Sequence, residues 1–216
     1  MKASHSKAIL NIRDQRREDS RQAVLIAAAD LFSKNGYNGV ALDDIATASG
    51  VRKNNLIYHF TSKKQLWKET VDWVFARTDA YFSEARGESV ADPWEGFEDY
   101  ARSYFEVCRR FPPYMLIPLL EGVNQSWRSD YLAEHHLRRN IGNFDRYAHE
   151  LVAAGVLPPI ESIYLQNIFT GGAQLFLALG PLWQKAIDVD THEPEFIENY
   201  VNALLRLLKA AQPKGA

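Results

Sequence analysis

The chain has very little cysteine and no long apolar run. Its only cysteine, Cys108, cannot form an internal disulfide or a multi-cysteine zinc site, and this usage fits a reducing compartment. No apolar run approaches the roughly 18 residues of a membrane-spanning helix. The N-terminal segment, residues 1–19, is too polar for the apolar core of a secretion signal. These absences predict a soluble, cytoplasmic protein that does not contact a membrane.

Sequence signatures of common catalytic sites are also missing. There is no glycine-rich phosphate loop, no nucleophile elbow and no HExxH motif. Glu134, His135, His136 and the later His149 come nearest to a metal-ligand set, but adjacent histidines on a helix point in different directions, which favours a solvent-facing or interface role. Cys108, beside two arginines, is interpreted as a buried inert thiol rather than a redox sensor. We therefore expect no enzyme activity, no catalytic residue, no bound metal and no cofactor.

Charge is distributed unevenly along the chain. Residues 1–70 contain 12 Lys and Arg against 7 Asp and Glu, a net charge of +5, whereas residues 71–216 contain 13 against 20, a net charge of −7. Phosphate contacts supply most non-specific DNA affinity, and an acidic body is repelled by the duplex. The first part of the chain is therefore the part that suits a polyanion.

The remaining pattern is helical throughout, with no useful strand alternation, no repeat and no low-complexity segment. Apolar residues recur at helical spacing, Asn35-Gly36 stops the first convincing helix, and Ser62 and Gln65 have the spacing of a capping box. The expected fold class is all-α. The expected helices are residues 18–35, 42–49, 52–59, about 62–86, 94–110, 114–124, 129–154, 160–179 and 194–211.

Residues 41–63, ALDDIATASGVRKNNLIYHFTSK, predict a helix-turn-helix. Gly50 supplies the positive φ of a sharp turn between two short helices, and Leu56 and Phe60 anchor the second helix. That helix begins with the basic, Asn-rich residues 52–55. The second helix of such a motif enters the DNA major groove with its N-terminal end first. The segment therefore predicts a DNA-reading element.

Four short motifs in this region resemble those of the TetR family of bacterial regulators. In order, they are Gly36-Tyr37, Asp44-Ile45-Ala46, Ser49-Gly50-Val51 and Phe60-Thr61-Ser62-Lys63. The resemblance spans about residues 20–66, and residues 53–60 are most similar to the branch that contains the pyrimidine-utilisation repressor. The chain length, the all-helical remainder and the two final helices also resemble that family.

The resemblance implies an N-terminal three-helix helix-turn-helix domain and a larger C-terminal helical domain that binds a ligand and dimerises. We expect a flexible basic arm over residues 1–17 and a DNA-binding domain over residues 18–65, with its recognition helix at about residues 52–59. The effector-binding and dimerisation domain is expected over residues 66–211, followed by a tail over residues 212–216.

The resemblance also implies which residues contact DNA. Base reading is expected from the first turns of the recognition helix, because Arg or Lys can bind guanine and Asn can bind adenine in the major groove. Backbone contacts fix the register and carry no sequence information. For any one residue, a solvated face, a turn or ordinary packing is the alternative interpretation. The expected DNA-binding residues are Arg52, Lys53, Asn54, Asn55, Tyr58, His59 and Lys63.

Three positions depart from the usual pattern of the family. Ala41 stands where a Ser or Thr usually caps the first helix of the motif, and loss of a cap costs about 1 kcal/mol. Asp43 and Asp44 offset part of this loss, since acidic groups are favourable in the first turn of a helix. Arg52 replaces a Ser and offers an additional phosphate or base contact, whereas Ile57 replaces a Tyr and lacks its hydroxyl donor.

A ligand pocket in the second domain is implied by the resemblance, and residues 94–183 contain many aromatic side chains for its walls. A pocket also needs a few convergent polar groups. An aromatic stripe at helical spacing is more often plain core than ligand wall, so both interpretations stand. The candidate ligand-binding residues are Tyr104, Cys108, Glu121, Asn124, Gln125, Trp127, Asn167 and Gln174.

The last two helices, about residues 160–180 and 194–211, are expected to form a four-helix interface with a second copy across a two-fold axis. The alternative is that both pack only within their own domain. Together, these features predict a ligand-responsive transcriptional regulator, a repressor, that binds a near-palindromic double-stranded DNA operator as a homodimer and is released by an unknown small-molecule effector. The alternative function is a helical small-molecule-binding protein or enzyme with a vestigial helix-turn-helix.

Overall fold

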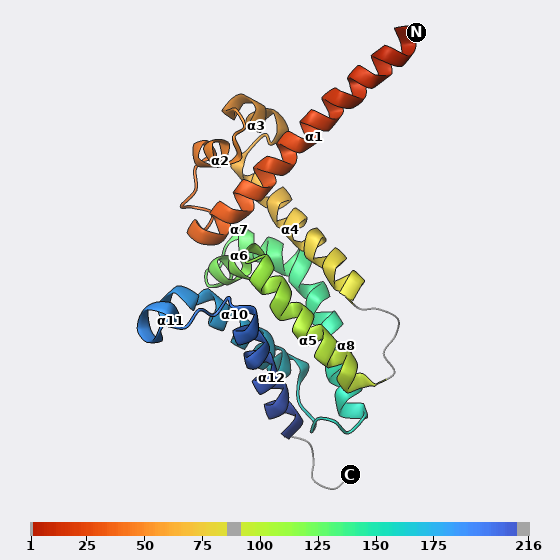
Figure 1. Ribbon diagram of the computed structural model, residues 1–216, viewed down its shortest axis with the longest axis vertical. Coiled ribbons are helices and arrows are strands. Elements are labelled where there is room, and N and C mark those ends of the chain that lie inside the picture. The colour runs from red at the N-terminus through yellow and green to blue at the C-terminus, as the bar shows by residue number, and fades with distance from the viewer. Residues whose placement is uncertain (1, 86–91, 211–216) are drawn as a thin grey trace. The chain divides into compact units, whose positions relative to one another are not determined.

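A computed structural model describes the backbone of residues 2–85 and 92–210, and the side chains of residues 14–82, 92–142 and 144–210. The expected tail over residues 212–216 lies outside this range. All regular structure in the described residues is helical, in agreement with the expected all-α class (Figure 1). Within those residues, no helix combines the length and apolar character needed to cross a membrane.

The chain divides into two compact units, Met1–Val74 and Phe75–Ala216. The boundary falls inside one continuous helix, α4 (Lys63–Ala85). It lies further along the chain than the expected boundary after residue 65. The reason is that Leu66, Trp67 and Val71 are all buried, so the first half of α4 belongs to the first unit.

The first unit is a three-helix domain completed by the start of α4. Its helices are α1 (Lys2–Asn35), α2 (Leu42–Ser49) and α3 (Lys53–His59). Each of them contributes apolar side chains that are almost completely buried, as the periodicity predicts. These side chains include Val24, Leu25, Ala28, Phe32, Ile45, Leu56, Phe60, Leu66 and Trp67.

Helix α1 begins at Lys2 rather than at about Glu18, where the sequence predicted the start of the first helix, so it includes residues 2–17 of the expected basic arm. Residues 2–17 contain neither proline nor glycine, the two residues that most disfavour a helix interior. Near the junction, the Gln15 side chain donates to Asp19 over 3.0 Å, one helical turn further on. Contacts of this spacing stabilise helices, and they explain why α1 continues towards the N-terminus.

The second unit contains the end of α4 and the remaining helices. Two of its segments are π-helical turns, here η1 and η2, within longer helical stretches. The elements are α5 (Pro93–Arg110), α6 (Pro113–Gly122), α7 (Trp127–Leu132), η1 (Ala133–Leu137), α8 (Arg138–Ala153), α9 (Ser162–Gln166), η2 (Asn167–Gly171), α10 (Gly172–Ala178), α11 (Gly180–Ile187) and α12 (Pro194–Ala210).

Two features of this unit differ from the sequence prediction. The long helix expected from residue 129 begins at Trp127, because the Ser126 side chain accepts from Arg128 N over 3.2 Å and caps it. Helix α11 was not expected, since it lies between the helices predicted at about residues 160–179 and 194–211. Proline is favourable in the first turn of a helix, and here it starts a new one.

The core of the second unit is centred on Phe169, which lies in η2 and is fully buried. A single π-helical turn changes the direction in which a side chain points, compared with a regular α-helix. Ring pairs about 4.5–7 Å apart add to the free energy gained by burial, so the cluster around Phe169 stabilises the packing of α5, α8 and η2 against one another. The rings around Phe169, with centroid separations of 5.6–6.4 Å, are Phe97, Tyr100, Tyr104, Phe105 and Phe144.

Candidate nucleic-acid interface and ligand region

A sharp glycine turn connects α2 to α3. Gly50 has φ of 68° and donates its N–H to Thr47 O over 3.3 Å. A side chain at this left-handed conformation would be strained, which is why glycine suits the position. The Ser49 hydroxyl accepts from Val51 N over 3.4 Å on the other side of the turn. The predicted helix-turn-helix is therefore present, with a defined turn.

The start of α2 lacks a side-chain cap, as the alanine at that position predicts. Ala41 has no acceptor, but its N–H donates to Asp44 Oδ2 over 2.8 Å. This is one half of a capping box, in which a side chain in the first turn binds the backbone N–H that precedes the helix. Asp44 thus replaces part of the missing cap.

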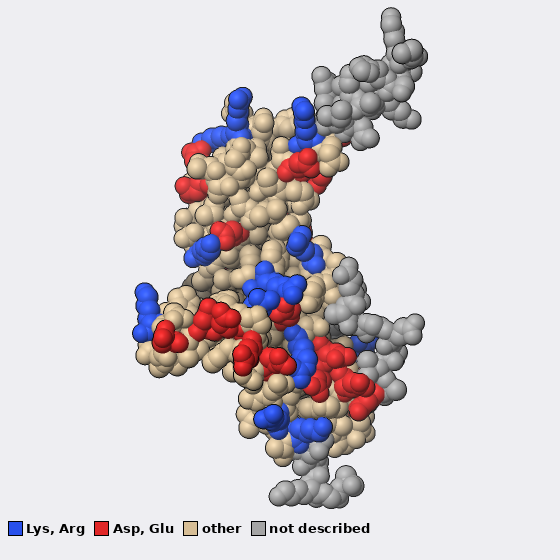
Figure 2. Space-filling model, viewed as in Figure 1, with Lys and Arg blue, Asp and Glu red and all other residues tan. Residues whose placement is uncertain are grey.

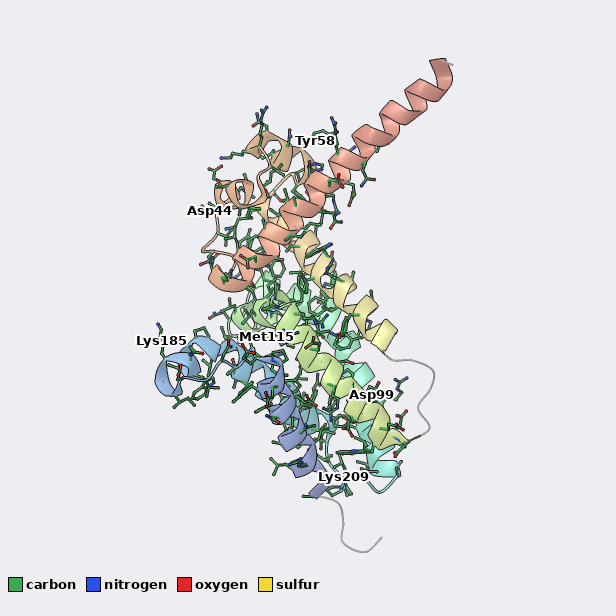
Figure 3. All side chains as sticks on the ribbon, in the orientation of Figure 1. Asp44, Tyr58, Asp99, Met115, Lys185 and Lys209 are labelled. Atoms are coloured by element: carbon green, nitrogen blue, oxygen red, sulfur yellow. The ribbon has the colours of Figure 1, made fainter. Side chains whose placement is uncertain are left out.

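Helix α3 has a buried face and a wide exposed face. Leu56 and Phe60 are fully buried and hold the helix against the unit. Ile57 is 44% exposed and Tyr58 is 69% exposed, so both lie on the outer face. Tyr58 is labelled in Figure 3. The structure places all seven predicted DNA-contacting residues on α3, its N-terminal cap or the start of α4. Exposed are Arg52, Lys53, Asn54, Asn55 and Tyr58; partly exposed are His59 and Lys63.

Several of these side chains also contact neighbours within the unit. The Arg17 guanidinium lies over the Tyr58 ring at 5.1 Å, and the Lys63 ammonium lies over the Tyr37 ring at 4.4 Å. Both distances are in the range of cation–π attraction. Lys53 Nζ lies 2.7 Å from Asp43 Oδ1. Side chains on the surface around α3 therefore contact neighbours within the first unit.

Arg17 is a member of this surface that the sequence prediction missed. Its signal was the spacing of Arg13, Arg17 and Arg21 at every fourth residue, which places them on one helix face. That signal is readable only if α1 is helical this far towards its N-terminus. The pKa of His59 is lowered by partial burial and by the charges of Arg17 and Arg21, against an opposing contribution from Glu18. His59 is therefore neutral near pH 7 and offers a hydrogen bond rather than a charge.

Charge on the second unit is mixed. Figure 2 shows Asp and Glu side chains forming a band across its visible face, interrupted by Lys and Arg. Some of the basic groups are paired with acidic ones, as in Arg102 with Glu98 at 2.6 Å and Arg139 with Asp79. This pattern agrees with the net negative charge of residues 71–216.

Three of the predicted ligand-binding residues lie together in the second unit. The Gln174 side chain donates to the Tyr104 hydroxyl over 3.1 Å, and Cys108 is buried one turn further along α5. Burial raises the pKa of the Cys108 thiol to about 12 and the pKa of Tyr104 well above its usual value. Both groups are therefore uncharged near neutral pH, and Cys108 is not a thiolate.

The other five predicted residues lie elsewhere. Glu121 is buried and pairs with Arg128 at 2.5 Å, and the Arg128 guanidinium lies 5.6 Å from the Trp127 ring. Asn167 is exposed, and its side chain donates to the carbonyl one turn earlier in its own helix. Also exposed, between α6 and α7, are Asn124 and Gln125. The structure therefore does not bring all eight residues into one site.

A surface pocket of about 400 Å³ occurs in a part of the second unit that the sequence did not indicate. It lies between the second half of α4 and the end of α5, and the Arg77 guanidinium lies 5.8 Å from the Phe111 ring. None of the eight predicted ligand-binding residues lines it. Its lining residues are Arg77, Thr78, Ala80, Tyr81, Val107, Arg110 and Phe111.

The two adjacent histidines, His135 and His136, have different surroundings. In the described part of the chain, no three His, Cys, Asp or Glu side chains are grouped to hold a metal ion. His135 is exposed and lies 4.1 Å from the Tyr131 ring. His136 is buried and stacks on Phe75 at 4.3 Å, so the expectation of a solvent-facing role is wrong for this residue. The π-helical turn η1 explains the difference, because it rotates His136 relative to a regular helix.

The C-terminal helices have an exposed apolar surface. Phe176 of α10 stacks on Tyr200 of α12 at 4.2 Å, and Gly172 allows this approach, since a Cβ there would lie 2.9 Å from the Tyr200 hydroxyl. Other large apolar side chains of these helices remain at the surface. Those at least 39% exposed are Ile163, Tyr164, Ile168, Leu175, Leu179, Leu182, Ile187 and Leu207.

Comparison with known proteins gives matches to both units. A family model described as "Bacterial regulatory proteins, tetR family" matches residues 24–70, the region of the helix-turn-helix. The HTH-type transcriptional regulator RutR of Escherichia coli (strain K12) is 33% identical over 192 residues, which cover 87% of this chain and 88% of RutR. That match therefore extends through the second unit.

Solved structures of similar fold include two bacterial regulators. The TetR family transcriptional regulator PfmR from Thermus thermophilus matches with a TM-score of 0.62 at 22% identity, covering 85% of this chain and 97% of PfmR. The ketosteroid transcriptional regulator KstR2 of Mycobacterium tuberculosis matches with a TM-score of 0.63 at 18% identity, covering 86% and 93%. At these identities the matches establish a shared fold.

Proposed function

This chain belongs to the TetR family of bacterial transcriptional regulators, and we propose that it acts in the cytoplasm as a homodimeric repressor. In this proposal it binds a near-palindromic operator and leaves it when a small-molecule effector binds. The observation that carries the proposal is the outer face of α3, where basic and amide side chains stand exposed on a helix anchored by Leu56 and Phe60.

In the proposed complex, α3 lies in the major groove. Arg52 and Lys53 bind guanine edges, whereas Asn54 and Asn55 bind adenine edges. Phosphate contacts come from the groups around this helix and set its register. The proposed phosphate-contacting residues are Tyr58, His59 and Lys63, with Arg17 added beside the Tyr58 ring.

The operator can be recovered by selecting duplexes from a random library with the purified full-length chain. We expect an inverted repeat whose half-sites are centred about 10 base pairs apart or at a multiple of that spacing, as a two-fold dimer requires. Affinity should fall by about 10³–10⁵-fold between 50 and 200 mM salt if 6–10 phosphates are contacted. A library that yields no enriched sequence, together with salt-independent binding, would exclude the proposed function.

Dimerisation is proposed through α9–α12, whose exposed apolar side chains form a surface on each copy. Burial of such a surface against a second copy removes apolar area from water, which is the main favourable contribution to association. Across a two-fold axis, the same surface of each copy contacts the other copy. This arrangement matches the mixture of small and large apolar residues along these helices.

The effector is proposed to bind within the second unit, close to the buried hydroxyl of Tyr104 and the amide of Gln174. These are convergent polar groups among apolar walls, as small-molecule sites require. The buried Cys108, one turn along α5 from Tyr104, is the third candidate residue in this proposed site. A ligand shifts an equilibrium only by its differential affinity for the two states, so the effector must favour the state that does not bind DNA. Because α4 contributes to both units, a shift along it is the proposed link.

A metabolite screen by thermal unfolding tests the effector proposal. At a concentration 100 times its dissociation constant, an effector stabilises the folded state by about 2.7 kcal/mol, which corresponds to about 5–10 °C in Tm for a chain of this size. Gln174→Ala should reduce this shift, whereas Arg77→Ala, in the surface pocket, should leave it unchanged. The reverse pattern would place the effector in the surface pocket, and a stabilising compound that does not release the operator would not be the effector.

A further inference from the structure

The surface pocket between α4 and α5 has the size of a small-molecule site. Its volume of about 400 Å³ falls within the usual range of such sites, roughly 300–1,000 Å³. It is formed by the second half of α4 and by the end of α5. None of the three residues of the proposed effector site, Tyr104, Cys108 and Gln174, lines it. A ligand in this pocket would therefore occupy a site other than the proposed effector site.

Two arginines line the pocket from different helices. Arg77 belongs to α4, and Arg110 is the last residue of α5. The Arg77 guanidinium lies 5.8 Å from the centroid of the Phe111 ring, a cation–π contact with another lining residue. A planar guanidinium binds a carboxylate through two parallel hydrogen bonds. The two helices therefore supply side chains that suit a carboxylate bound between them.

The charge around the pocket is positive, although residues 71–216 carry a net charge of −7. Both oxygens of Glu106 accept from Arg109, each over 2.8 Å, and Arg110 pairs with the same carboxylate. Three arginines, counting Arg77, and one glutamate give this group a net charge of +2. The acidic residue that lies between the α4 lining residues is paired with Arg139. A local excess of positive charge attracts an anion.

The rest of the pocket wall is mainly apolar. Val107 is buried, and the rings of Tyr81 and Phe111 are partly buried. Such a wall gains free energy by removing an apolar group of the ligand from water. From the arginines and this wall we propose that the pocket is a second ligand site, which binds an amphipathic organic anion, a carboxylate joined to an apolar body.

Titration of the full-length chain with para-trifluoromethylbenzoate, followed by fluorine NMR, tests the site. We expect saturable binding of this probe, because it combines a carboxylate with an apolar ring. The neutral para-trifluoromethylbenzamide should bind at least about tenfold more weakly, since a hydrogen bond to a charged group is roughly twice as strong as a neutral one. Trifluoroacetate, which has the charge but no ring, should also bind at least about tenfold more weakly, because it buries little apolar area.

Substitution of the arginines locates the bound probe. Arg77→Gln and Arg110→Gln should each lower benzoate affinity by about three- to tenfold, and the double variant by about 10- to 100-fold. Both side chains are exposed, so the thermal unfolding midpoint should change little. The matched control is Arg146→Gln, since Arg146 is also an exposed arginine of the second unit and lies 5.3 Å from an aromatic ring, that of Tyr147. This control and Gln174→Ala should leave benzoate affinity unchanged.

Four results would overturn the second site. The first is no saturable binding of the benzoate, and the second is equal binding of the benzamide. The third is unchanged benzoate affinity in the double variant of Arg77 and Arg110. The fourth is a loss in Gln174→Ala as large as in that double variant, which would place the probe at the proposed effector site. The titration involves no DNA, so its failure leaves the proposed operator binding intact, and failure of operator selection leaves the second site intact.

Discussion

Replacing Arg52 and Lys53 together by alanine is expected to lower operator affinity by about 10²- to 10⁴-fold, since each good base contact supplies roughly 1–3 kcal/mol of discrimination. Both side chains are exposed, and Arg52 makes no side-chain cap to α3. The fold should therefore persist, with a thermal unfolding midpoint close to that of the unaltered chain. Anisotropy titrations with the selected operator and with a scrambled duplex measure the loss.

A control variant removes the same number of positive charges from the second unit. Arg146→Ala with Lys185→Ala also deletes two exposed basic groups, but in the second unit (Figure 3 labels Lys185). This variant should retain operator binding to within a few-fold, because neither residue belongs to the unit that contains the helix-turn-helix. An equal loss in both variants would mean that general electrostatics, not base reading, sets the affinity. No loss in either would agree with the alternative of a vestigial helix-turn-helix.

The helix-turn-helix was predictable from the sequence because its geometry depends on local rules. Gly50 is required where the backbone enters the left-handed region. Leu56 and Phe60 repeat at helical spacing and are buried, so the remaining residues of α3 form its outer face. Asp44 similarly compensates for Ala41 within one turn of α2. None of these features needs information from distant parts of the chain.

Features that depend on context were less predictable. The N-terminal extension of α1 has no strong apolar periodicity, so its helical state was not evident from amphipathic pattern. The two π-helical turns leave no mark in the spacing of residues, yet they direct His136 and Phe169 into the core. The pairing of Lys53 with Asp43 crosses a turn, and residue type alone does not reveal it.

The residues of the ligand region were still harder to predict from the sequence, because they come together only through tertiary packing. Tyr104 and Gln174 are far apart in the sequence but hydrogen-bonded in the structure, whereas Asn124 and Gln125 are adjacent and exposed. Composition indicated aromatic and polar residues in the second unit. Which of them converge depends on tertiary packing, so the eight candidates included residues that do not share a site.

The C-terminal surface depends both on the local periodicity of its helices and on tertiary packing. In α12, Ile197, Val201 and Leu205 are buried. Leu207 of α12 is 71% exposed and Leu175 of α10 is 54% exposed, so these leucines are available for a partner. Single exposed apolar residues are common on protein surfaces. The concentration of such residues on α9–α12 is what favours a second copy as the partner.

Leu175→Glu with Leu207→Glu is therefore expected to convert the proposed dimer into a monomer. Burying a leucine stabilises by about 1.5–3 kcal/mol, and the two-fold axis makes each substitution count twice, so the dimer dissociation constant should rise by at least about 10⁴-fold. Operator affinity should fall by about 10²–10⁴-fold, because the second half-site is no longer tethered to the first. Sedimentation equilibrium measures the dimer dissociation constant, and anisotropy measures the operator affinity.

Val123→Glu, at a 74% exposed apolar residue outside α9–α12, is the control and should remain dimeric. A Leu175/Leu207 variant that stays dimeric would move the interface to another surface, since buried glutamates without partners are not tolerated in an apolar contact.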